Sequence, residues 1–339
     1  MIESSNLEKI DASGMYKIYD RWPEIAEDAF TSEFEKIEFK DVNHIVFAGM
    51  GGSGAIGDTF ASIFSKTEIH ISIVKGYLLP NTTNSKSVVI VTSVSGNTEE
   101  TLSILNAAKE KKCKIIAVSS GGKIKEFCKK NQIYYIEISK IHSPRSSFVK
   151  FTYSLLKILE SIIPISKEEV IDSINTMKVL RENISSKNLS DKNSAIKLAK
   201  WITDIPLIYY PWGLNAVAIR FKNSLQENSK IHVMIEDVVE VSHNGIVAWE
   251  NTSNVQPILL QGKDDHIKTK ERWEIFKKYF EQNNIEYENI FSVEGNILSK
   301  IMNLIYFVDY VSIYKAILTE IDPSPVNSID FIKNNLNQL

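Results

Sequence analysis

Short apolar runs alternate with amphipathic segments through the first half of the chain. Five runs have the length and the β-branched content of strands: 44–48, 69–74, 87–92, 114–118 and 133–138. The segments between them place apolar residues at helical spacing, most clearly over 49–64, 98–111 and 123–130. Strands that alternate with helices of this length predict a doubly wound α/β domain built on a parallel sheet.

The same rhythm returns in the second half, after a run of helices. Helical spacing covers 1–40 and 146–160, and two polar helices fill 166–204. Strand patterns follow at 207–210, 231–234, 256–260 and, more weakly, 285–290, with helices over 269–282 and 298–319. We therefore predict two α/β subdomains of similar size in tandem, residues 1–160 and 161–339.

Composition narrows the class of protein. The 339 residues are 43% hydrophobic and 24% charged, with a net charge of −3, which gives no electrostatic reason to expect nucleic acid or an anionic membrane as a partner. No apolar run approaches the roughly 20 residues of a membrane span, and the acidic N-terminus does not resemble a signal peptide. These features predict a cytoplasmic protein.

The cysteines and histidines give no metal motif. Cys113 and Cys128 do not form a CxxC pair, and no histidine stands at metal-ligand spacing from them. The six histidines form no HxH or HExxH arrangement. We expect reduced thiols, no bound metal and no cofactor.

A glycine cluster follows the first predicted strand. Residues 49–54 read Gly-Met-Gly-Gly-Ser-Gly, so the backbone can approach a ligand closely at the start of the next helix. The spacing also satisfies GxGxxG, but the acidic residue that a dinucleotide site needs is missing, because the next strand ends at Lys75. NAD binding, a plain strand–helix turn and an anion site all remain open at this point.

A second loop is more specific. Residues 92–101 read Thr-Ser-Val-Ser-Gly-Asn-Thr-Glu-Glu-Thr between a buried strand and a helix. Ser93, Ser95 and Thr98 supply three hydroxyls where helix N–H groups already favour an anion. A simple capping turn, with Ser95 or Asn97 as the cap, needs only one of them. The lysine of a nucleotide-binding P-loop is absent, so we predict a phosphate site for a small molecule.

These two motifs together resemble the sugar isomerase (SIS) fold, and the whole chain resembles the archaeal-type bifunctional phosphoglucose/phosphomannose isomerases. The likeness continues in order through five further segments: Ser143–Ser147, Arg220–Asn223, Glu227–Lys230, His243–Asn244 and the stretch from Asp322 through Val326 to Lys333. It implies two SIS-type subdomains and a metal-free isomerase that interconverts glucose 6-phosphate and mannose 6-phosphate with fructose 6-phosphate.

The resemblance also implies roles for residues. Gly52, Ser53, Ser93, Ser95 and Thr98 would bind the phosphate of the substrate. Glu227, which alone would be interpreted as a solvated helix residue, matches the base that carries a proton between C1 and C2. Arg145, which could otherwise steer phosphate or lie at a surface helix start, would stabilise the enediolate.

Three further residues follow from the same likeness. His243 matches a histidine that opens the sugar ring from the neighbouring subunit, which implies a homodimer with a shared active site. Lys333 matches a lysine that reaches the substrate, although a tail of this composition is also typical of a surface helix. Ser324 stands where a threonine is common and is a candidate for the position linked with accepting both C2 epimers; this departure makes dual specificity less secure.

Two rival functions remain. The first is an isomerase of another sugar phosphate, such as a glucosamine-6-phosphate synthase isomerase module or an arabinose-5-phosphate isomerase; the chain lacks a glutaminase half and obvious regulatory repeats. The second is a non-catalytic sugar-phosphate sensor. Such a sensor usually carries a basic DNA-binding segment, whereas residues 24–35 carry five acidic side chains that would repel DNA.

Overall fold

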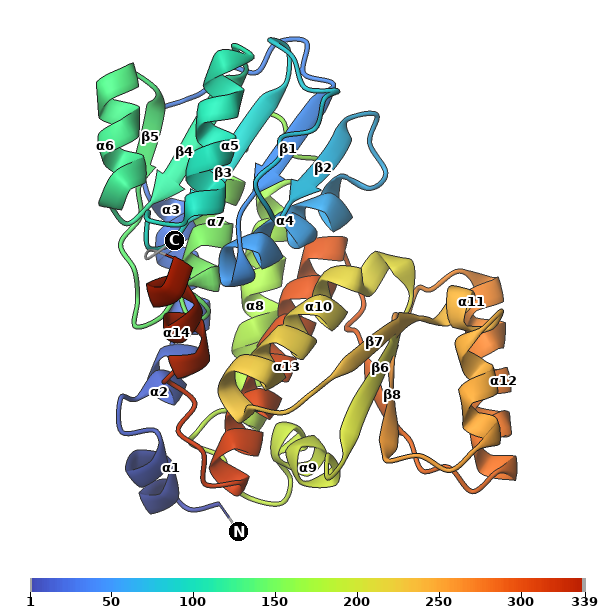
Figure 1. The fold of residues 1–339 in the computed structure, drawn as a ribbon. Coiled ribbons are helices and arrows are strands. Elements are labelled where there is room, and N and C mark those ends of the chain that lie inside the picture. The colour runs from blue at the N-terminus through green and yellow to red at the C-terminus, as the bar shows by residue number, and fades with distance from the viewer. Residues whose placement is uncertain (1, 337–339) are drawn as a thin grey trace.

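The computed structural model describes residues 2–336 and contains two parallel sheets joined by a shared layer of helices (Figure 1). The first sheet has five strands in the order β2-β1-β3-β4-β5, and the second has four in the order β7-β6-β8-β9. All strand pairs are parallel. The predicted α/β class is therefore confirmed.

The N-terminal part contains three leading helices and the five-stranded sheet. Its elements are α1 (Ser4–Ile10), α2 (Met15–Asp20), α3 (Trp22–Thr31), β1 (His44–Ala48), α4 (Gly51–Phe64), β2 (His70–Val74), β3 (Val88–Ser93), α5 (Glu99–Glu110), β4 (Lys114–Ser119), α6 (Gly122–Asn131), β5 (Tyr134–Glu137) and α7 (Phe148–Ile158).

The C-terminal part contains the four-stranded sheet and the longest helix. Its elements are α8 (Lys167–Ile184), α9 (Ser194–Trp201), β6 (Ile205–Tyr210), η1 (Trp212–Leu214), α10 (Asn215–Ser224), η2 (Leu225–Ser229), β7 (Met234–Asp237), α11 (Val238–Val241), η3 (Gly245–Glu250), β8 (Val255–Gln261), α12 (Ile267–Gln282), β9 (Glu288–Phe291), α13 (Ile297–Leu318) and α14 (Asn327–Leu336).

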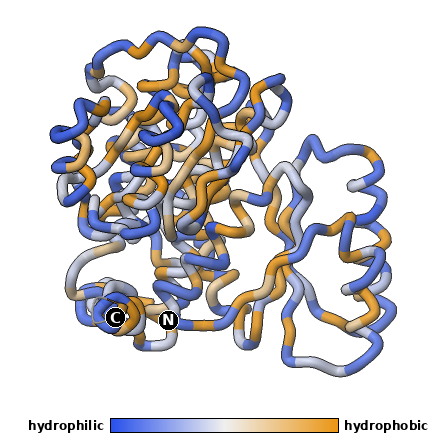
Figure 2. Tube along the Cα trace, turned by 45° about the horizontal axis from the view of Figure 1, so that its top comes forward, coloured by the Kyte–Doolittle hydropathy of each residue, from blue (hydrophilic) through white to orange (hydrophobic). Residues whose placement is uncertain are grey.

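Continuous apolar strands are explained by burial on both faces of each sheet. In β1, Ile45 and Phe47 belong to the central core, whereas Val46 and Ala48 face α5 and α6 in a second cluster. In the second sheet, Ile258 of β8 faces the central core and Leu259 faces α12. Figure 2 accordingly shows hydrophobic segments inside and hydrophilic ones on the outer turns.

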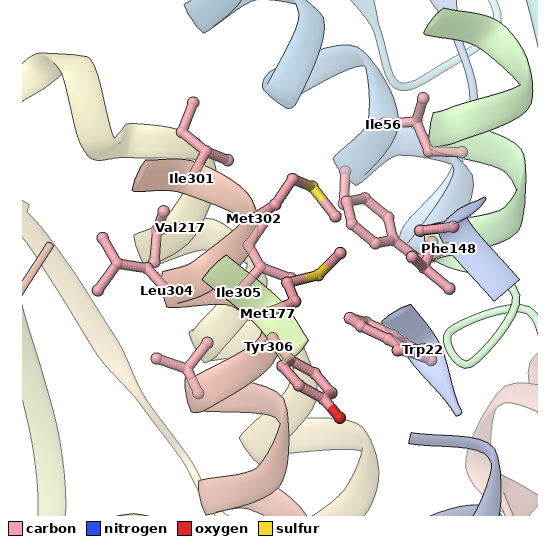
Figure 3. Packing of buried hydrophobic residues seen from close by; sticks show 14 of the residues in the cluster. Trp22, Ile56, Phe148, Met177, Val217, Ile301, Met302, Leu304, Ile305 and Tyr306 are labelled. Atoms are coloured by element: carbon pink, nitrogen blue, oxygen red, sulfur yellow. The ribbon is translucent and has the colours of Figure 1, made fainter. Parts of the chain in front are cut away.

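The helix α13 lies in the middle of the central core. Its Met302, Ile305 and Tyr306 lie close to Trp22 and Phe148 from the N-terminal part (Figure 3). The rings of Trp22 and Tyr306 stack with centroids 5.7 Å apart. Both sheets therefore share one core, and the subdomain boundary at 160/161 stays a prediction.

One helix within the part of the chain that the structure describes, α13, is long and apolar enough to cross a membrane by length and composition. Most of it is buried inside the fold, which is the position of the core helix of a soluble protein. The prediction that no apolar run approaches this length was therefore wrong for α13, whose hydrophobic residues serve the core instead.

The strand order determines where a ligand can bind. In the first sheet the chain leaves β1 toward β2 and then reverses to β3. At such a reversal the loops after the two strands diverge and leave a crevice beyond their carboxyl ends. The glycine cluster follows β1 and the hydroxyl loop follows β3, so both predicted phosphate loops border this crevice.

Candidate active site

The loop after β3 combines buried hydroxyls with an uncapped helix start. The hydroxyls of Ser93 and Thr98 lie 2.9 Å apart, and Ser93 Oγ accepts a hydrogen bond from the Gly96 N–H at 3.1 Å. Thr98 is the residue preceding α5, yet its side chain does not cap the helix. The first N–H groups of α5 are therefore left without a side-chain cap, as an anion site requires.

The capping alternative does not describe this loop. Ser95 is exposed and accepts only from the Asn97 N–H at 3.3 Å, and Asn97 Oδ1 accepts from the Lys123 N–H at the start of α6. Gly96 has φ of +71°, and a Cβ there would lie 1.8 Å from the carbonyl oxygen of Gly121. The loop thus needs glycine for both conformation and space.

The glycine cluster lies against the loop after β3. Ser53 Oγ accepts from the Val94 N–H at 3.3 Å, which ties the two loops together. The residue preceding α4, Met50, also provides no side-chain cap. A Cβ at Gly52 would lie 3.2 Å from the Pro144 carbonyl oxygen and 3.3 Å from Arg145 Cα, so the glycine lets the segment that carries Arg145 approach.

Arg145 and Glu227, predicted from positions 82 residues apart, are neighbours. Arg145 Nη1 lies 3.3 Å from Glu227 Oε2, and the Arg145 side chain is only 4% exposed against 24% for Glu227. Glu227 lies in η2, a single π-helical turn that continues α10. The structure therefore brings a carboxylate and a guanidinium together next to Gly52.

The guanidinium of Arg145 donates hydrogen bonds to several acceptors within the protein. Nε donates to Asn228 Oδ1 at 2.6 Å, and Nη2 donates to the carbonyls of Pro323 and Ser324 at 2.5 and 2.9 Å. A guanidinium has five N–H donors, and with Glu227 these acceptors engage four. Among residues 2–336 the fifth N–H, on the Nη1 that faces Glu227, has no acceptor.

Lys230 adds a second positive charge at the same place. Its Nζ donates to the Pro325 carbonyl at 2.8 Å and to the Glu227 carbonyl at 2.5 Å. Burial, and next the nearby Arg145, lower the pKa of Lys230 below its ordinary value. The environment around Glu227 is therefore electropositive, which favours an anion.

A buried ion pair supports the cluster from behind. Arg220 Nη2 donates to Asp309 Oδ2 at 2.5 Å and to the main-chain carbonyl of Arg145 at 2.7 Å. Burial alone would lower the pKa of Arg220, but the Asp309 carboxylate raises it above the ordinary value. The guanidinium also lies 4.6 Å from the ring centroid of Phe148. Sequence patterns could not assign these contacts, because their partners are far apart along the chain.

Ser324 is brought to the cluster only through its main chain. Its carbonyl accepts from Arg145, while its hydroxyl bonds that of Ser13, which also contacts His142 Nε2 at 3.0 Å. The side chain therefore faces the leading helices.

The structure does not bring His243 or Lys333 to this cluster. Within residues 2–336 neither side chain has a hydrogen bond or ion pair to Arg145 or Glu227, and both are exposed. His243 follows α11, which Figure 1 places on the outer side of the second sheet, away from α14 and α13. Lys333 lies on α14, which buries none of its residues.

The equivalent loop of the second sheet is closed by the protein itself. Asp265 Oδ2 accepts from the Gly262 N–H at 3.0 Å and from Trp273 Nε1 at 3.0 Å, where a bound anion would sit. The residue before α12, His266, caps that helix through Nδ1. A groove of about 510 Å³ beside α12 is lined by residues such as Lys263 and Phe291 and contains neither Arg145 nor Glu227.

Among the described residues no group of three or more histidine, cysteine, aspartate or glutamate side chains lies together as a metal site would require. The cluster around Arg145 and Glu227 combines a carboxylate with fixed cationic donors, and two loops with hydroxyl groups lie beside it.

The fold and the crevice define a SIS-type sugar-phosphate protein. A family model described as the SIS domain matches residues 38–162, and one described as the bacterial phospho-glucose isomerase C-terminal SIS domain matches residues 191–336. The chain resembles a hypothetical protein of Thermus thermophilus (TM-score 0.71, 12% identity, 99% of this chain and 89% of the other). It also resembles a putative phosphosugar isomerase of Bacillus subtilis (TM-score 0.64, 17% identity, 92% and 97% covered).

Sequence relatives narrow the class to one family. The chain is 34% identical over 316 residues to the bifunctional phosphoglucose/phosphomannose isomerase of Caldicellulosiruptor bescii, covering 89% of this chain and 92% of that protein. It is 31% identical over 333 residues to the protein of the same name from Aquifex aeolicus, covering 95% and 96%. The chain belongs to the bifunctional phosphoglucose/phosphomannose isomerases, a family of enzymes.

Proposed function

We propose that this protein interconverts glucose 6-phosphate and mannose 6-phosphate with fructose 6-phosphate through an enediolate, with Glu227 as the base. Family membership supports the substrates. The pairing of Arg145 Nη1 with Glu227 Oε2 at 3.3 Å, against the wall of the phosphate crevice, is the observation that carries the mechanism.

The phosphate of the substrate binds between the two loops. Ser53, Ser93, Ser95 and Thr98 donate hydroxyl hydrogen bonds, and the uncapped N-termini of α4 and α5 supply N–H groups. Gly52 lets the segment that carries Arg145 lie close to the start of α4. No metal or cofactor is needed for this binding, and the sugar chain then extends toward Arg145.

Proton transfer follows from the paired carboxylate and guanidinium. Glu227 removes the proton from C2 of the open-chain aldose, the C2–H electron pair forms the C1–C2 double bond, and the charge moves to O1. The Arg145 Nη1 N–H that has no acceptor in the described part of the chain stabilises that oxygen. Glu227 then returns its proton to C1, which bonds it with the C1–C2 π electron pair. The O2 proton moves to O1 and the O2–H electron pair forms the C2=O bond, which gives the ketose.

Ring opening is assigned to His243 of the partner subunit. His243 is exposed and, among the described residues, has no hydrogen bond or ion pair to Glu227, which supports an active site completed by a second copy. Lys333 on the exposed helix α14 would reach the substrate from the C-terminal tail. Ser324 would influence the choice between C2 epimers through its carbonyl on Arg145. The free cysteines fit a cytoplasmic location.

The test measures fructose 6-phosphate formation from each aldose phosphate with EDTA present, in wild type and in Glu227→Gln. We expect turnover of both sugars, and a loss of about 10²–10⁴-fold in kcat in the variant, which is the usual contribution of a general base. Glu169→Gln is the matched control, because glutamine can replace the glutamate of its capping box at α8.

Two results would reject the proposal. Binding of both sugar phosphates without turnover would favour a sensor, which needs no base. Full activity in Glu227→Gln would support the isomerase activity but show that Glu227 is not the base.

A further inference from the structure

Asn228 lies fully buried between the Arg145 guanidinium and α13. Its Oδ1 accepts from Arg145 Nε at 2.6 Å, and its Nδ2 donates to Ser312 Oγ at 2.8 Å. Ser312 Oγ in turn donates to the Asp309 carbonyl at 2.6 Å. Because arginine can only donate, this chain of hydrogen bonds has one direction and fixes the orientation of the carboxamide.

The turn that carries Asn228 is itself attached to Ser312. Ser229 Oγ donates to the Ser312 carbonyl at 2.7 Å, so two consecutive residues of η2 bond to the same residue of α13. A single π-helical turn is often found at functional sites. Here it places Glu227 toward the crevice and Asn228 toward the core in adjacent positions.

The main chain of Arg145 is anchored to the same helix by a separate route, through Arg220 and Asp309. The backbone position of Arg145 therefore does not depend on Asn228. Asn228 instead helps to set the orientation of the guanidinium, because it accepts from Nε while the carbonyls of Pro323 and Ser324 accept from Nη2.

We infer that Asn228 is a positioning residue for the isomerase reaction: it helps to aim the Arg145 Nη1 N–H, which has no acceptor among the described residues, at the enediolate oxygen. This inference rests on the proposed function. Without Oδ1, Nε would be left buried and unpaired, which would favour a tilt of the guanidinium about its remaining bonds to Pro323 and Ser324. The phosphate crevice would be unchanged, since Asn228 makes no contact with it.

The experiment compares Asn228→Ala, Asn228→Asp and Ser312→Ala with wild type in steady-state kinetics over pH. In Asn228→Ala we expect kcat to fall about 10²-fold, the usual effect of misplacing a reacting group by about 1 Å, with KM changed less than about threefold. Ser312→Ala keeps the asparagine but frees its Nδ2, so kcat should fall by a smaller factor.

Asn228→Asp provides the readout that a merely structural role would not move. Aspartate keeps the shape and accepts from Nε, but it adds a negative charge one residue from Glu227. The acidic limb of the kcat/KM profile should therefore shift to higher pH. Inhibition by inorganic phosphate should stay within about twofold of wild type in all three variants, since the crevice is intact.

Asn193→Ala is the control, because Asn193 is also fully buried and hydrogen-bonded but caps α9 away from the site. It should lose stability and keep both kcat and the pH profile. Unchanged kcat in Asn228→Ala, or an unmoved acidic limb in Asn228→Asp, would overturn the inference in an active enzyme. If Asn228→Ala does not fold, the other two variants decide. A wild type without turnover would instead reject the proposed function.

Discussion

At the scale of single residues, most N–H donors of the Arg145 guanidinium are already hydrogen-bonded within the protein. Four of its five N–H groups are engaged by Asn228, Glu227 and the carbonyls of Pro323 and Ser324. Such a group needs no reorganisation when charge develops on the substrate. Lysine has a positive charge but a single nitrogen, and it cannot reproduce this planar set of bonds.

Arg145→Lys should therefore lose about 10²–10³-fold in kcat, comparable with removing an oxyanion-hole donor. The loss should appear with both aldose phosphates. Arg181→Lys, at the partly exposed pair with Glu24, is the control and should stay near wild-type activity. Steady-state rates of the purified variants check this, and an Arg145→Lys enzyme with more than a tenth of wild-type kcat would show that charge alone suffices.

At the scale of elements, the loops after β3 and β8 occupy equivalent places in the two sheets but differ in the hydrogen bonds of their N–H groups. The loop after β3 leaves the start of α5 without a side-chain cap and lines it with hydroxyls. The loop after β8 directs the Gly262 N–H to Asp265, and burial raises the pKa of that carboxyl. We therefore expect the first sheet to bind the phosphate of the substrate.

Ser93→Ala and Thr98→Val each remove one hydroxyl from the crevice. We expect KM for fructose 6-phosphate to rise about 10-fold in each, corresponding to about 1.4 kcal/mol, with kcat changed less. Inhibition by inorganic phosphate should weaken by the same factor. Thr101→Val, one turn into α5, is the control because its hydroxyl bonds the Thr98 carbonyl instead. An unchanged KM in both variants would show that the phosphate binds at another place.

The sequence pattern was sufficient for most strands and for the hydroxyl loop after β3, because these depend on local features. The strand predicted at 231–234 was misplaced, because β7 spans Met234–Asp237. The apolar runs that became β1, β3 and β4 are buried on both faces, and the hydroxyls of Ser93 and Thr98 are five residues apart. The π-helical turn at 225–229 and the orientation of Ser324 could not be predicted. They depend on partners such as Ser312 and Ser13, 84 and 311 residues away.

At the scale of the whole molecule, protonation of buried histidine links stability to pH. His44 is buried at the start of β1, with Nε2 2.9 Å from Ser72 Oγ and its ring 4.9 Å from that of His70. Burial, and next the charge of His70, lower the pKa of His44 below 6.5. Burial likewise lowers the pKa of His142.

A lowered pKa means that the unfolded chain binds more protons than the native one below about pH 6.5. The contribution of His44 is therefore fully present above that pH and is lost as the pH falls toward the native pKa. The free energy of unfolding should fall between about pH 7.5 and 5.5, and less steeply in His44→Gln. Urea titrations at several pH values measure this, and equal slopes in both proteins would contradict it.

The predicted shared active site requires the protein to form a dimer. Glu227→Gln and His243→Ala should each be nearly inactive alone. In a statistical mixture of co-expressed chains, half of the dimers are mixed and each has one intact site, so about a quarter of wild-type activity should return. If both residues act within one chain, no activity returns. A chain that sediments as a monomer yet remains fully active would also contradict the prediction.

The bonds from Arg145 to the carbonyls of Pro323 and Ser324 have a consequence for biosynthesis. Both sheets, the phosphate crevice and Glu227 precede residue 323 in the order of translation. A nascent or prematurely terminated chain could therefore complete most of its tertiary structure while the guanidinium still lacks two acceptors. The proposed reacting centre would be completed last, so we expect a chain that ends before residue 323 to fold but to have little isomerase activity.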